Sequence, residues 1–181
     1  DEYLIVDLSG ELRERQRDTI EAAAPALAAK VRWLDALPER FDGVVVGNEV
    51  LDAMPVRLFA KADGAWRERG VALDARQAFV FDDRPVGAAG LPAVLATLDV
   101  GDGYVTETHE AALAFTRTVC TMLARGAVLL VDYGFPAHEY YHPQRDRGTL
   151  MCHYRHHAHD DPFVYPGLQD ITAHVEFTGI Y

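Results

Sequence analysis

The chain contains only two cysteines among 181 residues, Cys120 and Cys152, and no CxxC spacing. A disulfide framework and a cysteine-rich zinc site are therefore not expected, and a reducing compartment is favoured. Long apolar runs are also missing, because the longest candidates, 43–46 and 126–131, are far shorter than the ~18 residues that a membrane span needs. We therefore expect a soluble protein.

Basic residues are scarce, since 17 Lys and Arg stand against 28 Asp and Glu, which gives a formal net charge of −11. This excess of acid disfavours binding to a nucleic-acid backbone and fits a cationic or neutral partner better. The composition, 49% hydrophobic and 25% charged, is typical of one globular domain, with room for an inserted subdomain. A phosphate-binding loop, a zinc-protease motif, a serine nucleophile elbow and a catalytic Cys–His signature are all missing, which disfavours hydrolases and kinases.

Neither end of the sequence has the features of a natural terminus. The chain lacks an initiator Met, begins almost directly with an apolar strand pattern and ends with another at 175–181. We therefore expect an internal portion of a longer chain and draw no conclusion on targeting.

Strand and helix patterns alternate along most of the chain. Strands are predicted at 3–8, 31–34, 42–47 and 127–131. A helix is predicted after Ser9, which is a good N-cap, and it should stop or kink near Pro25. A second helix is predicted at 108–125 with its stop at Gly126. The alternation predicts an open, mostly parallel α/β sheet, in which the apolar strand around 44–46 is covered on both faces.

Two segments depart from this pattern. Alternating apolar residues around an Asp63-Gly64 turn predict a small antiparallel β-rich insertion at 55–85, so the core is expected to comprise 1–54 and 86–181. Residues 135–166 hold four prolines and six of the eight histidines, which predicts a long ordered loop with a functional role. The histidines lack the spacing of a metal site, so we expect no metal and favour bonds from His side chains to loop carbonyls.

Polar residues stand where the predicted strands end, which is the edge at which doubly wound sheets bind ligands. Asp7 is suited to binding the two hydroxyls of a ribose, but its position fits capping of the next helix together with Ser9 equally well. Trp33 lies at another strand end, where an adenine would stack.

The stretch after the third predicted strand is the most unusual one. Glu49 and Asp52 are spaced i, i+3, so both carboxylates would point into one cleft if a helical turn follows. Such a pair suits a cationic group, with a guanidinium accepted in forked geometry, or the work of a general base. The alternative is a helix start, where the helix dipole favours acids whatever the function.

Several longer stretches resemble the MidA-like family of class I S-adenosylmethionine-dependent methyltransferases. The family's mitochondrial member is the arginine methyltransferase needed for respiratory complex I assembly. The resemblance extends over most of the chain, and its most specific parts are NEVLDAMP at 48–55 and PGLQDITAHV at 166–175. The other matching stretches are YLIVDLS at 3–9, DYG at 132–134, GTL at 148–150 and HDDP at 159–162.

The resemblance implies a Rossmann-like methyltransferase sheet that binds S-adenosyl-L-methionine. Glu49 and Asp52 would be its catalytic residues, and we hypothesise that they orient an arginine guanidinium by forked hydrogen bonds. The cofactor-binding residues would be Asp7, Leu8, Ser9, Trp33, Leu34, Asp35 and Asn48, and the substrate-binding residues would be Tyr133, Asp170 and His174. The family's first strand and glycine-rich loop have no counterpart in this sequence, so the cofactor site is expected to be incomplete.

Other functions stay open at this point. The acceptor could differ from arginine, although the (Asn/Asp)-Pro-Pro-(Tyr/Phe) sequence of amide and base methylation is missing after the third predicted strand. A non-catalytic assembly or docking factor could keep the fold and use the insertion and the His/Tyr segment as its surface. A nicotinamide oxidoreductase shares the acid after an early strand. The expected partner is a protein substrate, such as a complex I subunit or its bacterial counterpart, in the bacterial cytoplasm or the mitochondrial matrix, and a homodimer stays open.

Overall fold

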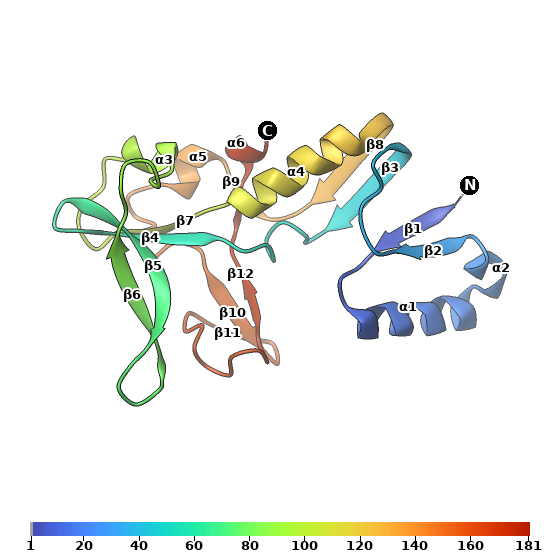
Figure 1. The fold of residues 1–181 in the computed structure, drawn as a ribbon, viewed down its shortest axis with the longest axis horizontal. Coiled ribbons are helices and arrows are strands. Elements are labelled where there is room, and N and C mark those ends of the chain that lie inside the picture. Colours follow the sequence, from blue (N-terminus) through green and yellow to red (C-terminus); the bar gives the residue numbers. More distant parts are fainter. Residues whose placement is uncertain (1) are drawn as a thin grey trace. The chain divides into compact units, whose positions relative to one another are not determined.

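The computed structural model describes residues 2–181, which divide into two compact units. The first unit comprises the chain up to Gly43 together with Val119–Ala127, and the second comprises Val44–Thr118 and Val128–Tyr181. Each unit is described by itself below, with element labels as in Figure 1. Among the described residues, none of the helices has both the length and the apolar character to cross a bilayer.

The first unit contains β1 (Tyr3–Val6), α1 (Gly10–Ala23), α2 (Pro25–Ala28) and β2 (Val31–Leu34). Strands β1 and β2 pair in parallel, and α1 runs alongside them (Figure 1). The Ser9 side chain caps α1 by accepting a hydrogen bond from Leu12 N at 3.2 Å, and the helix breaks at Ala24, directly before Pro25. The predicted start and break of this helix are therefore confirmed.

Strand β3 (Phe41–Asn48) pairs with β8 (Leu123–Val131), and exposed and half-buried residues alternate along it. Val44 and Val46 are 63% and 68% exposed, so one face of β3 is open to solvent among the described residues. The cover predicted for both faces of this strand is therefore not present within residues 2–181. An uninterrupted apolar run shows that both faces tolerate burial, but it does not supply the element that would cover the second face.

Helix α4 (Glu110–Met122) ends earlier than predicted, because β8 begins directly at Leu123. Gly126 lies inside β8 and does not stop the helix. Its φ is +141°, and an added Cβ would lie 1.7 Å from the carbonyl oxygen of Gly43. The glycine is therefore required by a close backbone approach within the first unit.

The largest sheet belongs to the second unit and has the strand order β6-β5-β4-β7. Its strands β4 (Arg57–Ala62), β5 (Ala65–Leu73), β6 (Phe79–Pro85) and β7 (Val105–Thr108) are all antiparallel. The antiparallel strands predicted for 55–85 are thus present, and β7 extends their sheet. The fold is mixed α/β, and the described strands fall into several sheets. Of the strands expected to form the parallel core, β1 and β2 do pair in parallel, whereas the hairpins β4–β5 and β5–β6 are antiparallel.

The segment expected to be one long loop contains several short regular elements. It contains β9 (Gly134–Phe135), α5 (Ala137–Tyr140), β10 (Met151–Tyr154) and β11 (His157–His159), and β10 also pairs with β12 (Asp170–Thr172). The turn between β10 and β11 is made by Arg155 and His156, whose φ angles are +48° and +67°. The hairpin of β10 and β11 was missed because these two residues give no turn signal in the sequence.

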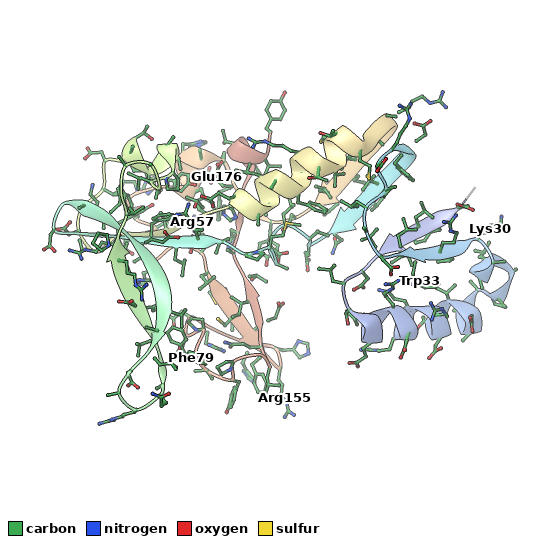
Figure 2. All side chains as sticks on the ribbon, viewed as in Figure 1. Lys30, Trp33, Arg57, Phe79, Arg155 and Glu176 are labelled. Carbon is green, nitrogen blue, oxygen red and sulfur yellow. The ribbon has the colours of Figure 1, made fainter. Side chains whose placement is uncertain are left out.

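Three short elements complete the second unit: α3 (Ala93–Ala96), β13 (Val175–Glu176) and α6 (Phe177–Ile180). Strand β13 pairs in parallel with β9. A buried cluster of the second unit is formed by Leu51, Ala112 and Val175, and Ile180 of α6 packs against it. At the far end of the β5–β6 hairpin, Phe79 and Phe81 pack against Phe163 with ring centroids 6.3 and 4.8 Å apart (Figure 2 labels Phe79). The long hairpin is therefore anchored to the 160s segment.

Candidate functional site

In the first unit, Asp7 follows β1 and is half-buried. One of its carboxylate oxygens accepts a hydrogen bond from Ser9 N at 2.9 Å, and the other accepts one from Gln16 Nε2 at 2.7 Å. Asp7 thus orients the backbone of Ser9, which is the residue whose side chain caps α1. Each carboxylate oxygen has a second lone pair, so the residue can also accept bonds from two vicinal hydroxyls of a ribose. The donor and acceptor chemistry at Asp7 therefore fits an adenosine ligand.

Trp33, in β2, is held by the same helix that follows Asp7. Its Nε1 donates to Gln16 Oε1 at 2.9 Å, and the Arg17 guanidinium lies 4.8 Å from its ring centroid (Figure 2 labels Trp33). Leu8 is 98% exposed beside Asp7. An acid, an indole and a free aliphatic side chain therefore come from the ends of two neighbouring strands, which is a suitable set for a nucleoside.

The remaining predicted residues of the first unit differ in exposure. Asp35 is exposed and forms an ion pair with Arg13 at 2.7 Å. Leu34 is half-buried within β2, opposite Val6. Ser9 caps α1. The second carboxylate oxygen of Asp35 has no partner among the interactions described, so this exposed residue can make a further polar contact.

In the second unit, Asp52 is the buried acid of the candidate site, with 4% of its surface exposed. The Tyr133 hydroxyl donates a hydrogen bond to Oδ2 of Asp52. Oδ1 is buried and has no hydrogen-bond partner among residues 2–181. Burial raises the pKa of Tyr133 to about 12, and the bond to Asp52 adds to this effect because the phenolate would face a carboxylate. The hydroxyl therefore stays a donor to Asp52 at neutral pH.

Asp132, the residue after β8, holds both members of this pair in place. Its Oδ2 accepts from Leu51 N at 2.9 Å and from Asp52 N at 3.3 Å, and its Oδ1 accepts from Tyr133 N at 2.9 Å. One carboxylate thus ties the turn that carries Asp52 to the segment that carries Tyr133. In the sequence, Asp132 belongs to the DYG stretch at 132–134 and directly follows the strand predicted at 127–131, and that position was the available signal.

Glu49 and Asn48 are both exposed at the end of β3. Glu49 has a φ of +49°, and its N–H donates to Val131 O at 2.8 Å, which fixes this bend against β8. The chain then forms a single turn, in which Met54 N donates to Leu51 O at 3.2 Å, and no helix follows before β4. The alternative interpretation of these acids as a helix start is therefore wrong. The turn buries Asp52 and leaves Glu49 in solvent.

His174 joins the Asp52–Tyr133 pair through its ring. It meets Tyr133 edge-on at 5.0 Å and stacks on Phe135 at 5.3 Å with an interplanar angle of 18°. Burial lowers the pKa of His174, and the positive charge of Arg145 lowers it further, so the ring is neutral at pH 7. Asp170, by contrast, is exposed in β12 opposite His153, and no bond joins it to this cluster among the interactions described.

Glu107 is a buried acid that sequence reasoning missed, because a single acid within a strand pattern gives no warning of burial. It accepts from Thr149 N at 2.8 Å, from Leu150 N at 2.9 Å and from the Tyr140 hydroxyl at 3.0 Å. Burial nevertheless raises its pKa, although these hydrogen bonds act in the opposite direction. Thr149 Oγ1 in turn accepts from His174 N at 3.0 Å, so this network contacts the candidate site through the backbone of His174.

The histidines of the 135–166 segment differ in their contacts. Among residues 2–181 there is no group of three or more His, Cys, Asp or Glu side chains that could hold an ion. His142 Nδ1 accepts from Gln144 N at 3.2 Å, whereas both ring nitrogens of His159 are buried without a partner among the described residues. The expected bonding of His side chains to loop carbonyls is therefore not what these two residues do.

The structure defines a mixed α/β protein with acids and aromatic side chains at its strand ends, which is a common plan for nucleotide-dependent enzymes. The chain belongs to the family described as "Putative S-adenosyl-L-methionine-dependent methyltransferase", whose model matches residues 1–181. This match confirms the family resemblance noted in the sequence.

Two solved structures from Burkholderia thailandensis are similar to this chain. A COG1565 superfamily member bound to S-adenosyl-homocysteine is 73% identical with a TM-score of 0.95, over 99% of this chain and 46% of that chain. A native structure of a COG1565 superfamily protein has the same identity and TM-score over 48% of its length. The chain thus spans about half the length of these proteins.

Curated relatives are more distant. The protein arginine methyltransferase NDUFAF7, mitochondrial, of Danio rerio is 28% identical over 151 residues, which is 80% of this chain and 33% of that protein. The NDUFAF7 homolog of Caenorhabditis elegans is 30% identical over 149 residues, with the same two shares. The chain therefore spans about a third of the curated relatives it matches.

Proposed function

We propose that the protein containing this chain transfers a methyl group from S-adenosylmethionine to an arginine side chain of a protein. The observation that carries the proposal is the buried Oδ1 of Asp52, which has no partner among the described residues. A buried carboxylate oxygen without a donor is costly, and a guanidinium is the group that best supplies one. The family match supports the cofactor, and the names of the distant relatives support the acceptor.

For the cofactor, the residues of the first unit would bind the adenosine half. Asp7 would accept bonds from the ribose hydroxyls, and Trp33 and Leu8 would contact the adenine. The B. thailandensis protein, 73% identical to this chain, was solved with S-adenosyl-homocysteine, which is what remains of this donor after the methyl group has left. When bound, S-adenosylmethionine supplies a methyl group on a positively charged sulfonium.

For the acceptor, the residues of the second unit would orient the guanidinium. Asp52 is fixed by Tyr133 and Asp132, so it offers its free oxygen in a set direction. Glu49 would accept from a second nitrogen, and together the two carboxylates would draw the positive charge away from the reacting nitrogen. Alignment of donor and acceptor supplies much of the rate enhancement in such displacements. Glu49 is exposed and would pass the released proton to solvent.

Calorimetric titration of S-adenosylmethionine into the full-length protein tests the cofactor assignment. We expect Asp7→Ala to weaken binding by roughly ten- to a hundredfold, since it removes charge-assisted hydrogen bonds of about 1.5–3 kcal/mol. Asp18→Ala is the matched control, because Asp18 is an exposed acid on α1 that belongs to none of the predicted site residues. Equal binding by wild type and Asp7→Ala would remove Asp7 from the cofactor site.

Methyl transfer to arginine peptides tests the acceptor. We expect Asp52→Asn and Glu49→Gln to lower turnover by at least about tenfold while S-adenosylmethionine binding is unchanged. Peptides with lysine or asparagine in place of arginine should not be methylated. Near wild-type turnover by Glu49→Gln would exclude that residue from catalysis. Cofactor binding without turnover on any acceptor, combined with stable binding to a partner protein, would favour a docking factor.

The biological substrate is proposed by the same reasoning. We propose a protein substrate of the kind suggested by the family resemblance, a respiratory complex I subunit or its bacterial counterpart, methylated in the bacterial cytoplasm or the mitochondrial matrix. The supporting observation is that the NDUFAF7 relatives are named as mitochondrial protein arginine methyltransferases.

A further inference from the structure

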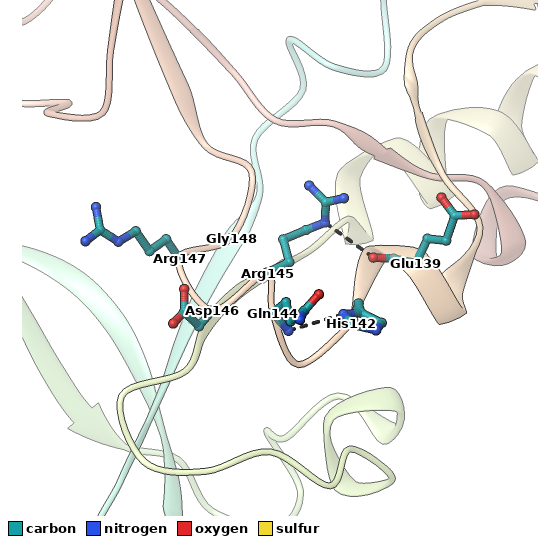
Figure 3. Close-up of a pocket in the computed structure, with 7 residues that line it drawn as sticks. All are labelled: Glu139, His142, Gln144, Arg145, Asp146, Arg147 and Gly148. Atoms are coloured by element: carbon teal, nitrogen blue, oxygen red, sulfur yellow. Dashed lines mark hydrogen bonds between the residues drawn. The ribbon is translucent and has the colours of Figure 1, made fainter.

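A cavity of about 430 Å³ opens on the second unit (Figure 3), and the turn that carries Asp52 contributes no lining residue to it. It lies over the segment that follows α5 and has charged residues of both signs. Its lining residues are Glu139, His142, Gln144, Arg145, Asp146, Arg147 and Gly148. The proposed function does not use any of them.

Arg145 is the side chain of this cavity that is held in place. Its guanidinium carbon lies over the Phe135 ring, 4.0 Å from the ring centroid. Its Nε donates to the backbone carbonyl oxygen of Glu139 at 3.3 Å, and a dashed line marks this bond in Figure 3. The residue is half-buried, so its orientation is restricted before any ligand binds. A restricted guanidinium loses less entropy on binding an anion than a free one does.

The charge of Arg145 is not neutralised by its neighbours. Within residues 2–181 it forms no ion pair, and its terminal nitrogens make no hydrogen bond that the structure describes. The Glu139 carboxylate lies 3.8 Å from His138 Nε2 and meets Arg145 only through the backbone. The planar fork of the guanidinium is thus available for a carboxylate, its best-matched partner among protein groups.

A continuous series of ring contacts joins Arg145 to the candidate acceptor site. Phe135 lies between Arg145 and His174, and His174 touches Tyr133, which donates to Asp52. The three separations, 4.0, 5.3 and 5.0 Å, place the guanidinium carbon no farther than about 14 Å from the Tyr133 ring. An extended peptide covers that distance with about four residues.

We propose that Arg145 determines substrate specificity by binding an acidic side chain of the methylated protein, within about four residues of the methyl-accepting arginine. This inference rests on the proposed function for the position of the acceptor. It names a feature of the substrate class, an Asp or Glu close to the arginine. Arg145 acts on binding and does not take part in the chemical step.

Peptide binding to the full-length protein, measured by fluorescence anisotropy in the presence of S-adenosyl-homocysteine, tests the inference. The probes are labelled peptides with one central arginine in a Gly/Ser host and either Asp or Asn at one position up to about five residues away. We expect the best Asp peptide to bind about fivefold more tightly than its Asn partner, the gain of a partly exposed ion pair. Arg145→Gln should abolish this preference and Arg145→Lys should retain part of it.

Arg147→Gln is the matched control, an arginine of the same cavity that forms no ring contact described here, and it should keep the preference. Equal binding of Asp and Asn peptides to the wild type overturns the inference, and so does a preference that survives Arg145→Gln. Methyl transfer to the same peptides tests the proposed function separately. An Asp preference in binding with no transfer to any peptide would contradict the proposed function while the acidic specificity stands.

Discussion

A buried carboxylate with an unsatisfied oxygen is the residue-scale feature that distinguishes this chain. Asp52 has one oxygen bonded to Tyr133 and the other without a described partner, and only 4% of its surface is exposed. Burial of such a group opposes folding, because a charge leaves water and gains less than its full set of hydrogen bonds. A chain that retains this arrangement is stabilised when a donor binds at Oδ1, and that is the property a substrate site requires.

The Tyr133 hydroxyl is expected to stabilise the fold through Asp52. Tyr133→Phe removes the only described donor to the Asp52 side chain and leaves both oxygens unsatisfied, so we expect a loss of about 1–3 kcal/mol in the free energy of unfolding. Urea denaturation at pH 7 measures it. Tyr165→Phe, at an exposed tyrosine, is the control and should change the stability by less than about 0.5 kcal/mol. Equal effects of the two variants would show that the Tyr133–Asp52 bond contributes nothing.

The stability of the fold in acid is expected to depend on His109. His109 is buried with Nε2 3.0 Å from the Tyr140 hydroxyl, and burial lowers its pKa to about 4. A lowered folded-state pKa means that the unfolded chain binds the proton more tightly. The contribution of neutral His109 to the free energy of unfolding is therefore fully present above about pH 6.5, the pKa of histidine in the unfolded chain. This contribution is lost as the pH falls towards 4.

His109→Gln removes this titration and keeps a side chain that can bond Tyr140. Between pH 7 and pH 4.5 we expect the wild type to lose about 2–3 kcal/mol more unfolding free energy than the variant. Urea titrations at the two pH values give the difference. Parallel losses in both proteins would mean that His109 does not titrate with folding.

At the scale of elements, β7 and the loop before β10 depend on one close approach. Gly148 has a φ of +74°, and an added Cβ would lie 2.2 Å from Oε1 of Glu107. Gly148→Ala should therefore introduce backbone strain and also displace the Glu107 carboxylate that bonds Thr149 and Leu150. Together these effects should lower the free energy of unfolding by about 3 kcal/mol or more.

Gly64→Ala separates the two causes. Gly64 lies in the β4–β5 turn with a φ of +72° and has open space around its Cβ position, so only the strain of about 1 kcal/mol applies. Thermal unfolding of the two variants should rank Gly148→Ala clearly lower. Equal destabilisation would show that the Glu107 contact has no part in the stability of the loop.

The elements that depend on local signals were predictable. Ser9 and Pro25 mark the start and the break of α1 because a cap and a missing N–H act within one turn of the chain. The hairpin of β10 and β11 was missed, since its turn is made by Arg155 and His156 and the pairing partner β12 is distant in sequence.

The candidate site divides in the same way into what local signals predict and what distant contacts determine. Asp52 and Tyr133 were selected as separate residues, but their bond and its support by Asp132 depend on contacts about 80 residues apart.

Over the whole chain of 181 residues, the formal net charge of −11 would attract the proposed cationic substrate before contact. The field of an acidic protein accelerates association with an arginine-rich peptide, and salt screens it, because the Debye length falls from about 30 Å at 0.01 M to about 3 Å at 1 M. Arg145 acts differently, since its ion pair would form after docking, in a half-buried cavity. The long-range charge and the local specificity should therefore respond differently to salt.

Stopped-flow binding of arginine peptides at low and high salt separates these two effects. We expect the association rate constant to fall by about tenfold between 0.02 and 0.5 M NaCl, and a citrulline peptide of the same sequence should lose much less. The Asp-over-Asn preference should persist as a difference in dissociation rate, because a half-buried pair is screened less than an exposed one. If the preference appeared in the association rate and vanished with salt, the acidic side chain would be sensed by long-range charge and not by the guanidinium of Arg145.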